Sequence, residues 1–159
     1  MLDHLKDLAG HIQWADAVAW HALGKSPAAM AEPDVLERLD HSATTALFFA
    51  KLLRGEQVSR PPDGIPPVDE IRAKTRRAGE ELAAWIGTAT DADLERRILV
   101  PWFKDVPDGF KSIDAFLQAI LHTQHHRAQT MTRLKQLGGE AKNVDYIIWI
   151  WKGRPEPRW

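Results

Sequence analysis

Residues 59–67 contain four prolines and one glycine, and this segment limits the folds open to the chain more than any other. Proline lacks a backbone N–H and clashes with the preceding helical turn, so the segment cannot continue a helix. It must be a connection, and it is long enough to span a bundle of helices. We therefore predict helices on both sides of a long crossover.

Hydrophobic periodicity and helix-breaking residues predict the main helices. They are expected at about residues 3–23, from after Pro33 to Gly55, at 68–86 and at 112–137. The hydroxyl of Ser112 is expected to cap the first turn of the last helix. Residues 87–109 are predicted to form a loop or hairpin that crosses the bundle. The predicted fold class is all-α, a four-helix bundle.

The composition excludes several classes of function. The 159 residues carry a formal net charge of -1 and contain no cysteine, so disulfides and zinc–thiolate sites are absent. A near-neutral chain gives no electrostatic reason to expect nucleic acid or a membrane surface as a partner. Residues 1–6 lack a signal-peptide pattern, and we expect a cytoplasmic location. The length predicts one domain over residues 1–159.

The C-terminal tail, residues 143–159, is strongly apolar and contains three of the seven tryptophans. The apolar side chains of the tail must be shielded from water, either by the rest of the chain or by a second chain. The tail is expected either to pack over its own bundle or to form part of a subunit contact, where tryptophan and tyrosine are enriched. We expect it to belong to the same domain.

His122 and His126 are four residues apart in the last predicted helix. Successive helical residues are rotated by about 100°, so the two imidazoles share one face and can bind the same ion. Gln129 continues this stripe. His41, in the second helix, is the best third ligand. Three histidines would leave coordination positions open for water or substrate, as in catalytic zinc sites.

Other residues compete for a place at this site. His125 lies at the edge of the stripe and could be a further ligand or could support one. His11, Trp14 and Phe48 are candidates for lining a pocket, and His11 could instead be a buried histidine that bonds within the protein. A different interpretation leaves the histidines in water, because apolar residues cluster on the opposite side of the last helix. The HExxH motif of helical zinc proteases is absent.

The chain resembles the DinB/YfiT-like family of metal-binding four-helix bundles. The resemblance covers most of the sequence, and its specific part is the run His122-x-x-x-His126-Arg127-x-Gln129. The remaining features are Trp14-Ala15, His41 followed by an aromatic pair and Gly55, Leu137-Gly138-Gly139-Glu140, and the apolar Asp145-Tyr146-Ile147-Ile148.

The resemblance implies up-down-down-up connectivity and one divalent ion held by His41, His122 and His126. Zinc or nickel is the first choice and iron another, because imidazole suits all three. It also implies a metal-dependent enzyme, of a thiol-dependent transferase or isomerase type or a hydrolase, with a low-molecular-weight thiol or another small molecule as substrate. The alternative is a non-catalytic, metal-binding stress-response protein. Either one is expected to be a homodimer.

Overall fold

A computed structural model describes residues 1–59 and 63–159 of the chain. The main helices are α1 (Leu2–Leu23), α3 (Pro33–Leu53), α4 (Val68–Thr88) and α6 (Ser112–Gln136). The shorter elements are α2 (Pro27–Met30), α5 (Asp91–Glu95), β1 (Arg97–Ile98), β2 (Phe110–Lys111) and α7 (Tyr146–Trp151). The predicted all-α class and the four main helices are confirmed.

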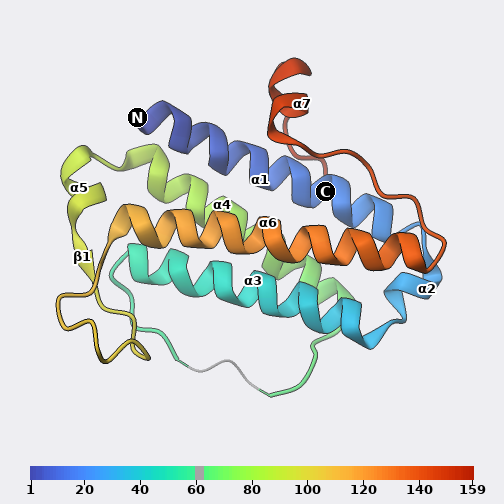
Figure 1. The fold of residues 1–159 in the computed structure, drawn as a ribbon, viewed down its shortest axis with the longest axis horizontal. Helices are drawn as coiled ribbons and strands as arrows, with labels where there is room; N and C mark the ends of the chain where they lie inside the picture. Colours follow the sequence, from blue (N-terminus) through green and yellow to red (C-terminus); the bar gives the residue numbers. More distant parts are fainter. Residues whose placement is uncertain (60–62) are drawn as a thin grey trace.

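The four long helices form a bundle with up-down-down-up connectivity (Figure 1). α3 and α4 run in the same direction, and α1 and α6 run in the opposite direction. α3 packs against both α4 and α6, while α1 packs against α4 and α6. Parallel neighbours need a connection that returns along the bundle, and the described residues 54–59 and 63–67 belong to it. The part of the predicted crossover at residues 60–62 lies outside the described residues.

The main core lies between all four long helices and extends under α5 and β1. Phe116 of α6, Leu53 of α3 and Leu82 of α4 are almost completely buried there. A second cluster closes the other end of the bundle around Leu23, Val35 and Leu134. Both clusters bury the apolar stripes that the helical periodicity predicted. Packing of this kind fixes the relative positions of α3 and α6, on which the histidines lie.

The segment between α4 and α6, predicted as a loop or hairpin, forms the short helix α5 followed by a two-stranded hairpin. Arg97 pairs with Lys111 and Ile98 with Phe110 in antiparallel register. Gly109 has a φ of 66°, and an added Cβ would lie 2.2 Å from the carbonyl oxygen of Ile98, so a larger residue would clash. The loop between the strands carries Trp102 and Phe103, which are half exposed.

The predicted capping role of Ser112 is wrong. The helix begins at Ser112 itself, Lys111 occupies the cap position, and no side chain caps the helix there. The Ser112 hydroxyl instead donates to the carbonyl oxygen of Arg96 at 2.9 Å, and its backbone N–H donates to the same oxygen at 2.8 Å. These bonds use the hydroxyl to join the hairpin to the start of α6.

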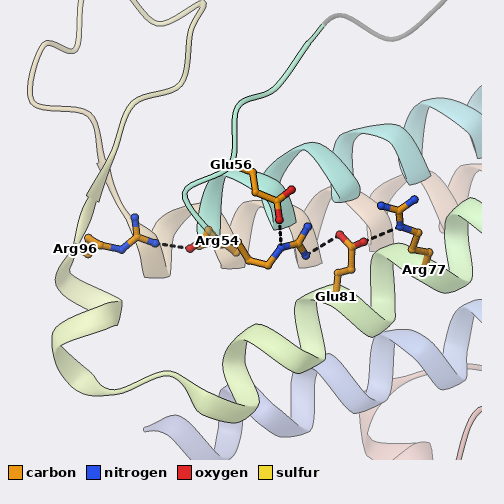
Figure 2. A network of polar contacts seen from close by, with 6 residues as sticks. Arg54, Glu56, Arg77, Glu81 and Arg96 are labelled. Carbon is orange, nitrogen blue, oxygen red and sulfur yellow. Dashed lines mark hydrogen bonds and ion pairs between the residues drawn. The ribbon is translucent and has the colours of Figure 1, made fainter.

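A network of charged side chains holds the end of α3 against α4 (Figure 2). Arg54 donates to Glu56 at 2.6 Å and to Glu81 of α4 at 2.8 Å. Arg77, one turn before Glu81, donates to the same carboxylate at 2.7 Å. Arg96 donates to the carbonyl oxygen of Leu53, so the hairpin is attached at the same point. The network fixes where the chain leaves α3.

The C-terminal tail packs on α1, which is the first of the two predicted arrangements. Trp149 of α7 is buried and lies against Gly10, where an added Cβ would be 3.1 Å from its ring. Arg154 forms an ion pair with Asp7 at 2.9 Å. Ile147 and Trp151 of the same short helix remain largely exposed. No helix in the described part of the chain is long and apolar enough to cross a membrane.

Candidate metal centre

Three histidines meet between two neighbouring helices. His41 lies on α3, and His122 and His126 lie one turn apart on α6. One ligand nitrogen can be chosen from each ring so that all three lie within 4.8 Å of one another. The structure therefore brings together the three histidines singled out from the sequence, and this group can hold a metal ion.

The spacing of the rings suits a single divalent ion. Nε2 of His126 lies 3.1 Å from Nε2 of His122. The ring centroid of His41 lies 5.0 Å from that of His122 and 4.9 Å from that of His126. Two nitrogens bound to one zinc ion at about 2.1 Å, at a tetrahedral angle, lie about 3.4 Å apart. The 3.1 Å between the nitrogens of His122 and His126 is close to this value, and a ligand nitrogen of His41 lies within 4.8 Å of both, so the group can surround one divalent ion.

The ring of His126 is oriented by Gln129. The Gln129 Oε1 lies 3.0 Å from Nδ1 of His126 and accepts a hydrogen bond from Arg38 of α3 at 2.6 Å. An oxygen can only accept, so Nδ1 of His126 carries the proton and its Nε2 keeps the lone pair that a metal needs. The Gln129 amide nitrogen donates to Nε2 of His125 at 2.9 Å. His125 is thus linked to the site through Gln129 and is outside the three-histidine group.

The pKa values of the α6 histidines are lowered by their surroundings. Burial, together with the neighbouring histidines, lowers the pKa of His122 to about 4. Burial and the charge of His41 also lower the pKa of His126, against a smaller opposite effect of its bond to Gln129. Both rings are therefore neutral near pH 7, and neutral imidazole is the form that binds metals.

The site is half covered. His122 and His126 are partly buried between α6 and α3, while His41 is exposed. The sequence had left open whether these histidines lie in water, and α3 packs against this face of α6. The apolar residues opposite, including Phe116 and Ile120, are buried in the core. Both faces of α6 are therefore occupied within one chain.

A cavity of about 490 Å³ opens beside two of the histidines. Its walls come from α3, α6 and the hairpin, and they include His41, Phe49, Trp102, Phe110, Asp114 and His122. A volume of this size suits a small organic molecule. The site thus combines three side chains that can bind a metal with adjacent space for a small molecule.

The other candidate residues lie in different places. His11 and Trp14 are buried beneath the C-terminal tail, where Nε2 of His11 lies 2.7 Å from the carbonyl oxygen of Val144. The ring of His11 contacts Trp14, Tyr146 and Trp149 and none of the three clustered histidines. His11 is therefore a tail-binding histidine, and neither residue lines the cavity at the metal centre.

Phe48 lies one residue away from the cavity lining. Its ring is 4.5 Å from that of Trp102, while its neighbour Phe49 lines the cavity itself. Phe48 therefore packs against Trp102 of the hairpin loop and does not itself line the cavity. Arg127 of the same run as the histidines forms an ion pair with Asp16 at 2.7 Å, and both side chains are buried. Burial raises the pKa of Asp16, against the opposing charge of Arg127.

Sequence reasoning did not find Arg38 or the aromatic residues of the hairpin. Arg38 is three residues before His41, so it shares a face of the helix with that histidine, and this spacing was a usable signal. Trp102, Phe103 and Phe110 come together with α3 only through the tertiary fold. No local pattern marks them as walls of the same cavity.

The fold and the site define a four-helix bundle with a candidate metal centre made of histidines from α3 and α6. The chain matches the family model described as the DinB superfamily over residues 8–130. This match includes all three clustered histidines and Gln129, and the chain belongs to the DinB superfamily. No curated protein and no solved structure matches it.

Proposed function

We propose that the chain binds one divalent ion through His41, His122 and His126 and acts as a metal-dependent enzyme on a small molecule. The observation that carries the proposal is the convergence of the three ligand nitrogens within 4.8 Å beside a cavity of about 490 Å³. Zinc and nickel are the first choices for the ion and iron is the next, because all three accept imidazole ligands.

Two kinds of chemistry are proposed. In the first, a thiol attacks an electrophilic substrate, which is then either transferred to the thiol or isomerised. The second is hydrolysis of the substrate. A divalent ion bound by three neutral histidines keeps its full positive charge and lowers the pKa of a coordinated water or thiol. The chain has no cysteine, so a thiol must come from a low-molecular-weight co-substrate. The residues of the chain would hold the ion and orient His126 through Gln129, while the cavity holds the substrate.

The second candidate is a non-catalytic, metal-binding stress-response dimer in which the ion joins α3 to α6. The exposed Ile147 and Trp151 of α7 offer an apolar surface that a second subunit could cover. A structural site of this kind is closed by a fourth protein ligand, whereas a catalytic site keeps an exchangeable position. Neither His125 nor His11 belongs to the three-histidine group. This favours the enzyme over the structural alternative.

Cobalt substitution separates the two candidates. Co²⁺ reports its coordination number through its visible spectrum, and a thiolate bound to it adds a charge-transfer band in the near ultraviolet. We expect one equivalent of Co²⁺ to bind and the spectrum to change when a small thiol is added. A Co²⁺ spectrum that stays unchanged at saturating thiol and azide would contradict an open site and support the structural alternative. Failure of Co²⁺ to bind would contradict both.

A further inference from the structure

Two matching stripes of side chains face the cavity beside the histidines. On α3 the stripe is His41, Thr45 and Phe49, and on α6 it is Asp114, Gln118 and His122. Members of each stripe are four residues apart and so lie on one face of their helix. α3 and α6 are antiparallel (Figure 1). Since the rings of His41 and His122 are 5.0 Å apart, the histidine ends of the two stripes coincide and Phe49 lies toward the Asp114 end.

The cavity therefore changes in character along its length. The metal-ligating histidines are at one end, and Thr45 and Gln118 provide hydroxyl and amide groups in the middle. Helical register places Phe49 and Asp114 at the far end, and Phe110, four residues before Asp114, also lines the cavity. Eight residues of helix span about 12 Å, so a ligand that reaches from one end to the other must be elongated.

Aromatic rings from the hairpin complete the far end. Trp102 and Phe103 line the cavity and have ring centroids 6.3 Å apart, and Phe103 lies 5.3 Å from Phe110 in an edge-on contact. Trp102 and Phe103 are about half exposed, at 58% and 48%. An apolar ligand that covered these rings would be stabilised, because burying exposed aromatic surface away from water is favourable.

Asp114 gives this end its charge. It is the only formally charged side chain among the described residues that line the cavity. Asp114 and Gln118 are exposed, and within the described residues neither side chain has a hydrogen-bond or ion-pair partner in the protein. A carboxylate beside aromatic faces attracts a cation, because the ring faces carry partial negative charge as well.

We propose that the cavity recognises an elongated small molecule with an aromatic ring and a cationic group, the ring lying among Trp102, Phe103 and Phe110 and the cation beside Asp114. This inference names the substrate class of the site described above and rests on the proposed function for the reacting end, which would lie at the histidines. The remaining part of the ligand would pass between Thr45 and Gln118.

Three molecules that share a phenyl ring and differ in charge test this recognition. They are phenethyltrimethylammonium, which cannot bind a metal, 2-phenylethanol, and 3-phenylpropanoate. Each would be titrated by calorimetry into the full chain, both metal-free and zinc-loaded, with circular dichroism to establish that the protein is folded. We expect the cation to bind about fivefold more tightly than the neutral alcohol, and the anion most weakly in the metal-free protein.

Single substitutions test whether Asp114 and Trp102 produce the preference for the cationic ligand. Asp114→Asn should bring the affinity for the cation to within about twofold of that for the alcohol, because the charge is lost while the shape is kept. Trp102→Ala should weaken both ligands. Asp105→Asn is the control. Asp105 is in the hairpin loop that carries Trp102 but does not line the cavity, so this variant should change neither affinity.

The outcomes separate this inference from the proposed function. A cation preference in the metal-free protein that disappears in Asp114→Asn supports the inference whether or not a metal binds. Equal binding of cation and anion in the metal-free protein, binding of none of the three, or an unchanged preference in Asp114→Asn would overturn it. Those results would leave the metal centre intact if zinc still bound to the same protein.

Discussion

Gln129 lies one turn beyond His126 on α6 and holds its ring, with Oε1 3.0 Å from Nδ1. The same oxygen accepts a hydrogen bond from Arg38, so the orientation of a histidine on α6 is set partly by a side chain of α3. Partners of this kind fix the protonation and direction of a metal-binding histidine. The relationship makes the candidate metal centre depend on residues that do not themselves touch the ion.

Gln129→Leu should weaken zinc binding by about 10-fold to 100-fold, because the His126 ring loses the acceptor for its Nδ1 proton. The affinity can be measured by competition with a chromophoric chelator. Gln129→Glu is the matched control, since it keeps an oxygen acceptor at the same distance along the side chain and should bind zinc at least nearly as well as the wild type. Equal zinc affinities for Gln129→Leu and the wild type would contradict an orienting role.

Removing only one partner of the buried ion pair between Asp16 and Arg127 should strongly lower the free energy of unfolding. Asp16→Leu leaves the guanidinium of Arg127 buried without its partner and should lower the free energy of unfolding by about 3–5 kcal/mol. Asp16→Leu combined with Arg127→Met removes both charges and should recover at least half of this loss. Urea denaturation measures both. A single variant as stable as the wild type would show that the pair is unimportant.

The stability contributed by Glu81 should depend on pH. Burial raises the pKa of Glu81, but the hydrogen bonds from Arg77 and Arg54 outweigh this effect and lower it below the ordinary value of 4.5 (Figure 2). A lowered folded-state pKa means that the contribution is complete above about pH 4.5 and is lost as the pH falls through the lower value. Glu81→Gln should therefore be destabilised at pH 7 and approach the wild type at strongly acidic pH.

Glu80→Gln is the control for the Glu81 variant. Glu80 pairs only with Arg76 within the described residues, and both side chains are about half exposed, so its loss should have little effect at any pH. Denaturant unfolding at a series of pH values tests both variants. A Glu81→Gln deficit that stays constant down to acidic pH would contradict the assignment.

Trp149 should hold the C-terminal tail against α1. It is 4% exposed, and its indole N–H donates to the carbonyl oxygen of Pro155 at 3.1 Å. Trp149→Ala should lower the free energy of unfolding by about 3 kcal/mol and increase amide exchange throughout residues 143–159. Trp151→Ala, at a position that is 79% exposed, should leave exchange unchanged. Similar exchange in the two variants would argue against the docked tail.

Local patterns were enough to predict the main helices and the pair His122 and His126. Helix ends are marked by nearby glycine and proline, and the spacing of the two histidines follows from helical geometry. His41 was chosen as a third ligand for its place in the second helix, and the family resemblance pointed to the same residue. Its contact with α6 depends on how the helices pack, which no local pattern determines.

The residues that form the wall of the cavity, and the partner of the buried His11, could not be predicted from local patterns. Trp102 reaches the site because a hairpin folds back over α3, and Ser112 bonds to Arg96 instead of capping its own helix. His11 is separated from Val144 by most of the chain, so its hydrogen bond to that carbonyl has no local signal. Long-range contacts of this kind decide which of several candidate residues share a site.

The metal content of tag-free protein, measured by elemental mass spectrometry, tests the central claim most directly. The account predicts close to one equivalent of a divalent metal in the wild type and in His4→Ala, whose side chain lies outside the cluster, and a large loss in His126→Ala. Circular dichroism would establish that each variant is folded. A folded wild type that contains no metal and takes up neither zinc, nickel nor iron would contradict the account.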